Sequence, residues 1–469
     1  MLFKSVIDSP SDLRYMSDTL DICSSVARKV LMETEMMDSK EELEEYYSVL
    51  RRNYLKLFAE SGDGRDKKVA LSTNKIREKL RMLRDIHSTL RHLSGGNVLD
   101  DIELFEIKYL ALLSEEIRDS VSAIGFEGIA IPQLTEVVSI LDPDGLNIRT
   151  FYIYDSYSEK LASVRLQMKA GEEAIGTEAF QKLLEESGEE EFKVRRMLCG
   201  KLRPFSGLLV KGLYELAALD ILIAKLFQIK ECSLVIPEIS SNGITSYKGM
   251  FHPHIKETLE QKGGAFTPID IEFGIEPVTV VGANMGGKTV VLKMLALNQY
   301  LFQFGFGVAA GSAAIDVKDN VFFCIGDEQN ILTGLSSFAA EMKQIDNVLD
   351  YIYDGRIRSG KNGRVLALVD EPARTTNPEE GRALAESLVD ILTGEPLSVL
   401  LTTHYNINCA DVRRMRVVGL VDGVMDYRLV NAESGDIPHE AINIARSLDI
   451  NSRWIARAEE RLAMENNGK

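Results

Sequence analysis

The feature that most constrains the fold is an apolar, β-branched run at 278–281 that leads into the pattern G-x-x-x-x-G-K-T and then into an apolar helical segment. Glycines let consecutive backbone N–H groups turn toward a phosphate. Lys288 can reach the β- and γ-phosphates, and the Thr289 hydroxyl can bind Mg²⁺. The residues predicted to bind nucleotide are Gly282, Asn284, Met285, Gly286, Gly287, Lys288 and Thr289. The pattern therefore predicts a P-loop between a strand and a helix; the alternative is a glycine-rich turn with a chance Lys-Thr.

Two later apolar runs end in side chains suited to phosphate chemistry. The run 365–369 ends in Asp370 and Glu371, and in such a pair the first acid organises Mg²⁺ while the second polarises an attacking water. The run 398–403 ends in His404, a candidate γ-phosphate sensor; the alternative is an ordinary histidine at a strand end. The predicted metal-binding residues are Thr289 and Asp370, and the predicted catalytic residues are Lys288, Glu371 and His404.

Composition is that of a soluble globular protein, with 45% hydrophobic and 27% charged residues among 469. A chain of this length predicts two or three domains. The sequence has no apolar stretch long enough to span a membrane and no signal-peptide layout, so we expect no membrane association and a cytoplasmic location. The five cysteines lack metal-ligand spacing, which favours reduced thiols.

The net charge of −17 disfavours, without excluding, a protein that holds duplex DNA, because neutralised phosphates supply much of DNA-binding affinity. Local basic patches can survive in an acidic chain. The candidates are Lys67, Lys68, Lys75, Arg77 and Lys79 in one patch and Arg195, Arg196, Lys201 and Arg203 in another. Each patch has a simpler interpretation as the solvated face of a helix.

Apolar and charged residues alternate at helical spacing from about residue 10 to 130, which predicts a helical N-terminal region. A further amphipathic helix is predicted at 450–464, packed on the sheet domain or on a dimer mate. The segment 185–191 is strongly acidic and is expected to form a loop.

Five segments follow one another in a distinctive order. They are 249–253, 282–289, 334–342, 370–376 and 403–405. Their order and spacing resemble the MutS family of ATPases, which belongs to the ABC class. The resemblance implies an α/β P-loop ATPase domain of ABC type, preceded by an all-α domain like the MutS core and lever. The domains expected from it are 1–232, mostly helical, 233–430, the ATPase, and 431–469, a C-terminal helical segment for dimerisation or packing.

The resemblance also implies a composite ATP and Mg²⁺ site in a homodimer, or in a heterodimer with a related subunit. The segment around Ser336 and Ser337 would contact the γ-phosphate held by the opposite subunit, and which serine does so is open. The alternative for these serines is a helix N-cap, with Glu341 starting the polar face. Phe266 lies where relatives place an aromatic that stacks on adenine; the alternative is a core phenylalanine.

Departures from the family pattern suggest the biological role. Ala283 replaces the usual proline of the loop, and the segment after Glu371 reads 372–378 with two prolines instead of glycine and serine. The mismatch-reading and connector domains are not found, and the clamp would have to fit between about 165 and 202. The chain is therefore similar to the MutS-like ATPase components that reactivate cobalamin-dependent aminomutases, which would make an aminomutase its protein client. The alternative is a minimal DNA-binding member that recognises mismatched or branched DNA.

Overall fold

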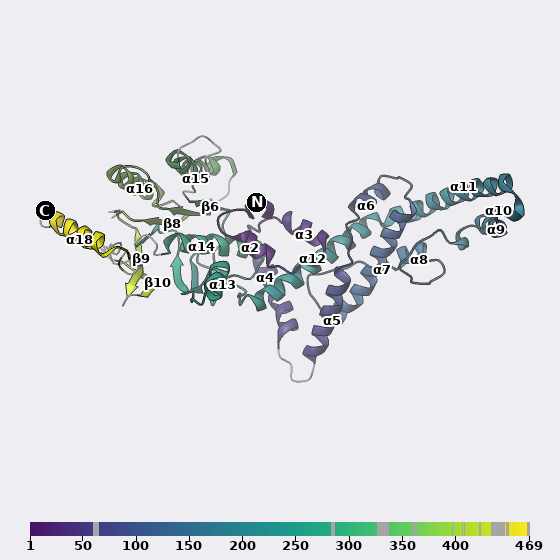
Figure 1. The fold of residues 1–469 in the computed structure, drawn as a ribbon, viewed down its shortest axis with the longest axis horizontal. Coiled ribbons are helices and arrows are strands. Elements are labelled where there is room, and N and C mark those ends of the chain that lie inside the picture. The colour runs from purple at the N-terminus through teal and green to yellow at the C-terminus, as the bar shows by residue number, and fades with distance from the viewer. Residues whose placement is uncertain are drawn as a thin grey trace. The chain divides into compact units, whose positions relative to one another are not determined.

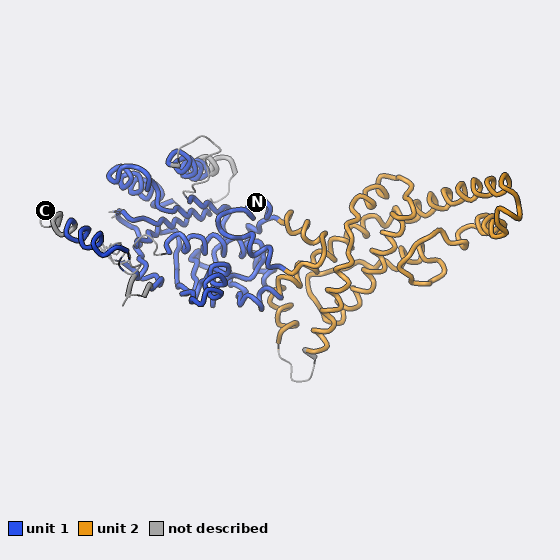
Figure 2. The backbone as a smooth tube through the Cα atoms, in the orientation of Figure 1, with its two compact units in different colours: residues 1–20, 35–48, 227–469 blue, residues 21–34, 49–226 orange. Residues whose placement is uncertain are grey.

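The computed structural model describes residues 1–59, 65–282, 287–325, 337–359, 364–395, 397–405, 407, 409–421, 424–432, 446 and 450–466. These residues form two compact units, which are described separately. Unit 1 comprises residues 1–20, 35–48 and 227–469, and unit 2 comprises residues 21–34 and 49–226 (Figure 2). The helices α4 (Lys40–Phe58) and α12 (Ser206–Glu231) contribute residues to both units.

Unit 1 is organised around a six-stranded sheet with the strand order β10-β9-β4-β8-β7-β6 (Figure 1). Its strands are β4 (Val278–Val281), β6 (Asn320–Cys324), β7 (Val365–Asp370), β8 (Leu397–Thr403), β9 (Arg413–Val421) and β10 (Val424–Asn431). All neighbouring strands are parallel except β9 and β10, which are antiparallel. Continuous apolar runs suit such strands, because a parallel sheet is covered on both faces.

Helices cover both faces of this sheet. Alternate residues of β7, namely Val365, Ala367 and Val369, pack into one core cluster with residues of α15 (Ser337–Ser359) and α16 (Pro378–Leu392). The helix α14 (Lys288–Gln303) also contacts β6, β7 and β8 and is buried along most of its length. Because side chains alternate between the faces of a strand, the two helical layers are specified by alternate positions of the same runs.

A smaller four-stranded sheet, with the order β1-β5-β2-β3, completes the strands of unit 1 among the described residues. Its strands are β1 (Glu238–Ile239), β2 (Thr245–Met250), β3 (Ile269–Phe273) and β5 (Ser312–Ile315). The remaining helices of this unit are α1 (Phe3–Val6), α2 (Leu13–Asp18), α13 (Pro253–Gln261) and α18 (Ser452–Asn466). The last of them confirms the helix predicted at 450–464, while its packing partner stays a prediction.

Unit 2 is built from helices, as the spacing of apolar residues predicts (Figure 1). They are α3 (Ser25–Met32), α5 (Arg65–Leu80), α6 (His87–Ser94), α7 (Asp101–Ile124), α8 (Thr135–Leu141), η1 (Asp155–Tyr157), α9 (Glu159–Met168), α10 (Glu172–Ile175), α11 (Thr177–Leu202) and η2 (Arg203–Phe205). None of the described helices of the chain is long and apolar enough to cross a membrane.

The expectation of an acidic loop at 185–191 is wrong, because this segment lies inside α11. Two of its five carboxylates are paired with neighbouring cations. Glu190 accepts hydrogen bonds from Lys160 at 2.9 Å and Lys193 at 2.7 Å, and Glu191 accepts one from Arg165 at 2.9 Å. A single glycine at 188 costs a helix only about 1 kcal/mol, which these contacts and the packing of α9 against α11 can offset.

Candidate functional site

The predicted site residues come from the ends of three adjacent parallel strands. Strand β8 lies between β4 and β7 in the sheet, with Val281 beside Thr403 and Asp370 beside Thr402. Parallel strands end at the same edge of a sheet, so the residues that follow them meet there. This edge therefore collects the loop after β4, the carboxylates that end β7 and the histidine that follows β8.

Lys288 is the first residue of α14 and contacts both the loop and the second carboxylate. Its ammonium donates a hydrogen bond to the carbonyl of Gly282 at 2.7 Å and lies 2.9 Å from Oε1 of Glu371. Both side chains of this ion pair are nearly buried, at 4% and 10% exposure. Gly287 precedes the helix with φ of 78°, and a side chain there would meet the Tyr427 ring, so the position favours glycine on both counts.

Thr289 and Asp370 are joined by a hydrogen bond. The Thr289 hydroxyl donates to Oδ2 of Asp370 at 2.7 Å, and the Thr402 hydroxyl donates to Oδ1 at 2.6 Å. A hydroxyl and a carboxylate are the hard oxygen ligands that Mg²⁺ prefers, and Mg²⁺ takes only one or two protein ligands at many phosphate sites. In the described part of the chain, no group of three or more His, Cys, Asp or Glu side chains is placed to hold a metal. Thr289 and Asp370 thus fit Mg²⁺ rather than a closed metal cage.

The backbone after β7 turns sharply at Glu371. Glu371 has φ of 45° and Ala373 has φ of 58°, a region that residues other than glycine rarely adopt. Surrounding groups hold this turn in place. The Glu371 N–H donates to the carbonyl and hydroxyl of Thr402 at 3.1 and 3.0 Å, and the Ala373 N–H donates to the Glu341 carboxylate at 2.6 Å. The turn directs Glu371 toward Lys288, as the ion pair shows.

The charges at this edge set the protonation of Glu371 and His404. Burial opposes ionisation of Glu371, but the hydrogen bond and charge of Lys288 outweigh it and lower the pKa of this carboxyl. Burial lowers the pKa of His404, with the charges of Lys288 and Arg374 acting in the same direction and Glu371 opposing them. Nδ1 of His404 is buried and has no hydrogen-bond partner among the described residues. An ionised carboxylate therefore lies close to a neutral imidazole at neutral pH.

Other predicted site residues are placed only in part. Asn284, Met285, Gly286 and Ser336 lie outside the described residues, and Ser337 is described only as the first residue of α15. Phe266 lies in the loop between α13 and β3 and is half-buried. Its contact with adenine stays a prediction. Glu341, assigned to a polar helix face in the N-cap alternative, is instead buried at 7% exposure.

Sequence reasoning missed two residues that support the site. Thr402 is fully buried and bonds both Asp370 and the Glu371 backbone, and its signal was a hydroxyl inside an apolar run. Glu341 bonds the turn at Ala373, and only its place in the fold reveals this role. Tyr427 of β10 also lies beside Gly287, with 39% of the residue exposed, a proximity that the sequence does not signal.

Part of the sheet domain is similar to a known protein family. Residues 278–428 match the family described as MutS domain V. This range begins with β4 and includes the strands and helices that carry Lys288, Asp370, Glu371 and His404. A helical N-terminal region followed by a mixed α/β sheet domain is consistent with this class.

The chain is also similar to proteins named Endonuclease MutS2. The one from Streptococcus pneumoniae serotype 19F is 27% identical over 339 residues, which cover 69% of this chain and 41% of that protein. Those of the strains Hungary19A-6 and CGSP14 show the same 27% identity over 339 residues. The chain therefore spans less than half the length of these relatives. The two comparisons together support membership of the MutS family.

Proposed function

We propose that the chain binds and hydrolyses ATP at the carboxyl edge of the six-stranded sheet and uses the cycle as a conformational switch. The observation that carries the proposal is the convergence of Lys288, Asp370 and Glu371 from two strand ends, with Lys288 2.9 Å from Glu371. The match of residues 278–428 to MutS domain V supports it independently. The site belongs to the P-loop class on this proposal.

Each residue has a role that follows from its chemistry. Lys288 would bind the β- and γ-phosphates, and Thr289 and Asp370 would hold a Mg²⁺ ion that neutralises phosphate charge. Glu371, kept ionised by its neighbours, would accept a proton from the attacking water. Phosphate oxygens compete with Glu371 for the Lys288 ammonium, so nucleotide binding would free this carboxylate for the water. Neutral His404 would position the water or contact the γ-phosphate.

The remaining parts of the site would come from the loop and from a second subunit. Gly282, Asn284, Met285, Gly286 and Gly287 would surround the phosphates with backbone N–H groups. Ser336 and Ser337 would reach the γ-phosphate of the opposite subunit, in a homodimer or in a heterodimer with a related chain. The proposed boundaries are 1–232 for the helical domain, 233–430 for the ATPase and 431–469 for the C-terminal segment.

A protein client fits the surface charge of the helical unit better than DNA does. Three of the nine basic residues of the candidate DNA-binding patches are engaged by acidic neighbours: Arg77 pairs with Asp21, Lys79 with Glu116 at 3.2 Å, and Arg195 with Asp101 at 3.0 Å. The net charge of −17 adds to this. We therefore propose a protein substrate such as a cobalamin-dependent aminomutase, which the switch would open to release damaged cofactor.

The second candidate is a DNA-binding function in repair or recombination. Similarity to proteins named Endonuclease MutS2 favours it, although the match covers only 41% of their length. In that case the paired helical units of a dimer would hold mismatched or branched DNA.

One experiment separates the two candidates. ATP turnover and binding would be measured with homoduplex, mismatched and branched DNA over a salt series, and in parallel with an aminomutase that carries damaged cobalamin. The proposal predicts no salt-sensitive DNA binding and a turnover that responds to the aminomutase. DNA binding that falls with salt, changes turnover and is weakened by Lys67→Glu with Lys68→Glu would establish the DNA function instead, because both lysines are exposed.

A further inference from the structure

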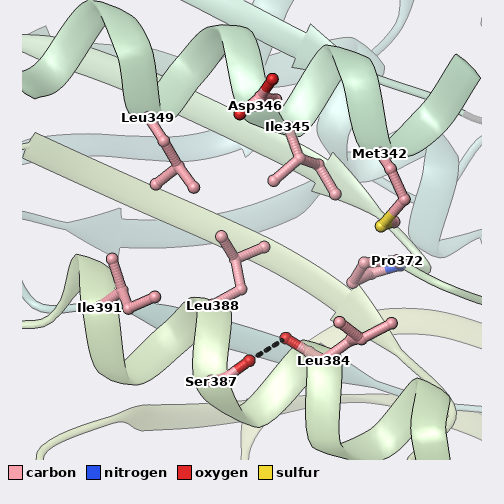
Figure 3. A pocket seen from close by; sticks show the side chains of 9 residues that line it. All are labelled: Met342, Ile345, Asp346, Leu349, Pro372, Leu384, Ser387, Leu388 and Ile391. Atoms are coloured by element: carbon pink, nitrogen blue, oxygen red, sulfur yellow. Dashed lines mark hydrogen bonds between the residues drawn. The ribbon is translucent and has the colours of Figure 1, made fainter. Parts of the chain in front are cut away.

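An apolar groove runs between α15 and α16 on one face of the six-stranded sheet (Figure 3). Its volume is about 210 Å³. The apolar side chains that line it are Met342, Ile345 and Leu349 of α15 and Leu384, Leu388 and Ile391 of α16. Figure 3 shows those of α15 directed toward α16 and Leu384 and Leu388 directed back toward α15. The groove is part of the sheet domain but uses none of the proposed ATP-binding residues.

The two walls present the same spacing of residues. With Asp346 and Ser387 included, each helix lines the groove at positions i, i+3, i+4 and i+7, the spacing of one helix face. Seven residues of helix rise about 10 Å, so the groove is long enough for about two turns of a third helix to lie along it. A helix with apolar residues at the same spacing would pack against both walls, as in other helix-in-groove complexes.

The inner part of the groove is core and the outer part is accessible. Ile345 and Leu388 are buried at 8% and 7% exposure and pack with the strands behind them. Leu384 and Ile391 are exposed by 40% and 46%, although leucine and isoleucine are usually buried. The groove therefore opens to solvent at Leu384 and Ile391.

Acidic side chains flank the opening on both helices. On α15, Asp346 lies at the edge and Asp350 is one turn further on. On α16, Glu380 is one turn before Leu384. All three acidic residues are exposed. Lys343 pairs with Asp346 at 2.8 Å and offsets only part of this charge. The rim is therefore complementary to a basic partner.

We propose that this groove is a docking site for a partner protein that inserts an amphipathic helix with an apolar stripe flanked by lysine or arginine. The apolar walls would supply affinity, and the acidic rim would select the charge of the helix and orient it. The inference goes beyond the proposed ATPase function and does not depend on it.

The groove also adjoins the turn that carries Glu371. Pro372, the next residue, lines the groove, and Glu341, which bonds the N–H of Ala373, precedes Met342 on α15. A partner helix that contacts Met342 and Pro372 would therefore touch the turn itself and the residue next to Glu341, one of the two residues that hold the turn in place.

The test uses the full chain without nucleotide, so its outcome is independent of ATP binding. The probe is a fluorescent synthetic helix of about 18 residues, with leucines at i, i+3, i+4 and i+7 and lysines on either side. Its binding is compared by anisotropy with that of a version carrying glutamates in place of the lysines. We expect at least tenfold tighter binding of the lysine peptide to the wild type. Leu384→Glu with Ile391→Glu should weaken that binding at least tenfold.

The choice of variants excludes general attraction to an acidic protein. The two glutamates add negative charge, so non-specific attraction would become stronger rather than weaker. Both positions are exposed, and substitutions at exposed positions rarely unfold a protein. Leu166→Glu on α9, at a residue with 68% exposure, is the matched control and should bind as the wild type does. Asp346→Lys with Asp350→Lys should reverse the preference toward the glutamate peptide.

Three results would overturn the proposal. The first is equal binding of the two peptides, and the second is unchanged binding by the Leu384 and Ile391 variant. The third is a wild type that sediments as a dimer without nucleotide while that variant sediments as a monomer, since the groove would then hold a second copy of the chain.

Discussion

The two edges of the six-stranded sheet each contain a buried lysine beside a carboxylate, yet their surroundings differ. At the carboxyl edge Lys288 lies 2.9 Å from Glu371, and at the amino edge Lys318 lies 2.8 Å from Asp316. The two lysine side chains are 4% and 3% exposed. Burial and ion pairing alone therefore do not distinguish a functional site from a structural one.

At the amino edge most polar groups bond one another, although the buried Oε1 of Gln299, whose amide nitrogen donates to Gln303 and to the Asp316 carbonyl, has no partner among the described residues. The Lys318 ammonium also donates to the Ser398 hydroxyl at 3.0 Å, and the Lys318 backbone exchanges hydrogen bonds with the Gln303 side chain. Arg364, just before β7, pairs with Asp319 at 3.0 Å, just before β6. These contacts tie the starts of the strands together, which is a structural role.

At the carboxyl edge the backbone turns through strained conformations. Glu371 and Ala373 have positive φ angles, and the buried Nδ1 of His404 has no hydrogen-bond partner among the described residues. Strained backbone in native proteins concentrates at functional sites. This difference supports the proposal that the carboxyl edge binds a ligand, whereas the contacts at the amino edge stabilise the fold.

The largest expected effect is on turnover at the carboxyl edge. Glu371→Gln removes the proposed proton acceptor and should lower ATP turnover about 100-fold or more, since general bases contribute about 10²–10⁴-fold. ATP binding should persist. Steady-state hydrolysis and equilibrium binding by the same preparation would check this, and normal turnover by the variant would show that Glu371 is not the base.

At the amino edge a comparable change should affect stability instead. Lys318→Ala leaves Asp316 without its partner and should lower the free energy of unfolding by about 3–5 kcal/mol. Denaturant unfolding measures the loss. ATP turnover per folded molecule should stay as in the wild type. If folded Lys318→Ala protein lost turnover as Glu371→Gln does, the amino edge would not have a purely structural role.

Two hydroxyl groups of β8 allow the two edges to be compared within one strand, because Ser398 lies near its start and Thr402 near its end. Thr402→Val removes the hydrogen bond to Asp370 and should lower turnover about 10- to 100-fold, the usual cost of losing an outer partner of a metal ligand. Ser398→Ala removes a hydrogen bond to Lys318 and should cost about 1 kcal/mol of stability without changing turnover. The two variants would be compared at equal folded concentration; equal turnover would contradict the assigned roles.

The smallest effect concerns pH. Burial lowers the pKa of His404 in the folded protein, so the unfolded chain binds more protons from about pH 6.5 down to that lowered pKa. The free energy of unfolding should therefore fall as the pH drops through this window. His404→Asn should make that decline shallower, and part of what remains is due to His252, whose pKa burial lowers to about 4. Urea unfolding at several pH values measures the slope, and an unchanged slope would remove His404 from this account.

Sequence reasoning identified the carboxyl edge because its signals are local. A glycine pattern before Lys288 and acids after an apolar run define positions along the chain, and the parallel sheet then brings them together. The helical unit was predictable for a similar reason, since helical spacing is a property of neighbouring residues.

The remaining features depend on contacts between distant segments. Glu341 and Ala373, which are 32 positions apart in the sequence, are joined by a hydrogen bond, and no local sequence pattern predicts it. The prediction of a loop at 185–191 is wrong for the same reason. Lys160 and Arg165, which pair with acidic residues of this segment, lie on α9, and the local sequence does not show that α9 packs against it. The groove likewise depends on the tertiary structure. The apolar residues of α15 and of α16 form a groove only because the two helices lie side by side, which the sequence of each helix does not show.

The most direct test of the account is calorimetric binding of ATP with Mg²⁺ to the wild type and to two lysine variants. Lys288→Ala and Lys318→Ala each remove a buried lysine from an ion pair of the same unit. The account predicts that the wild type and the folded Lys318→Ala protein bind ATP, whereas Lys288→Ala loses detectable binding. Equal binding by both variants, or no binding by the wild type, would contradict the claim that the carboxyl edge is the nucleotide site.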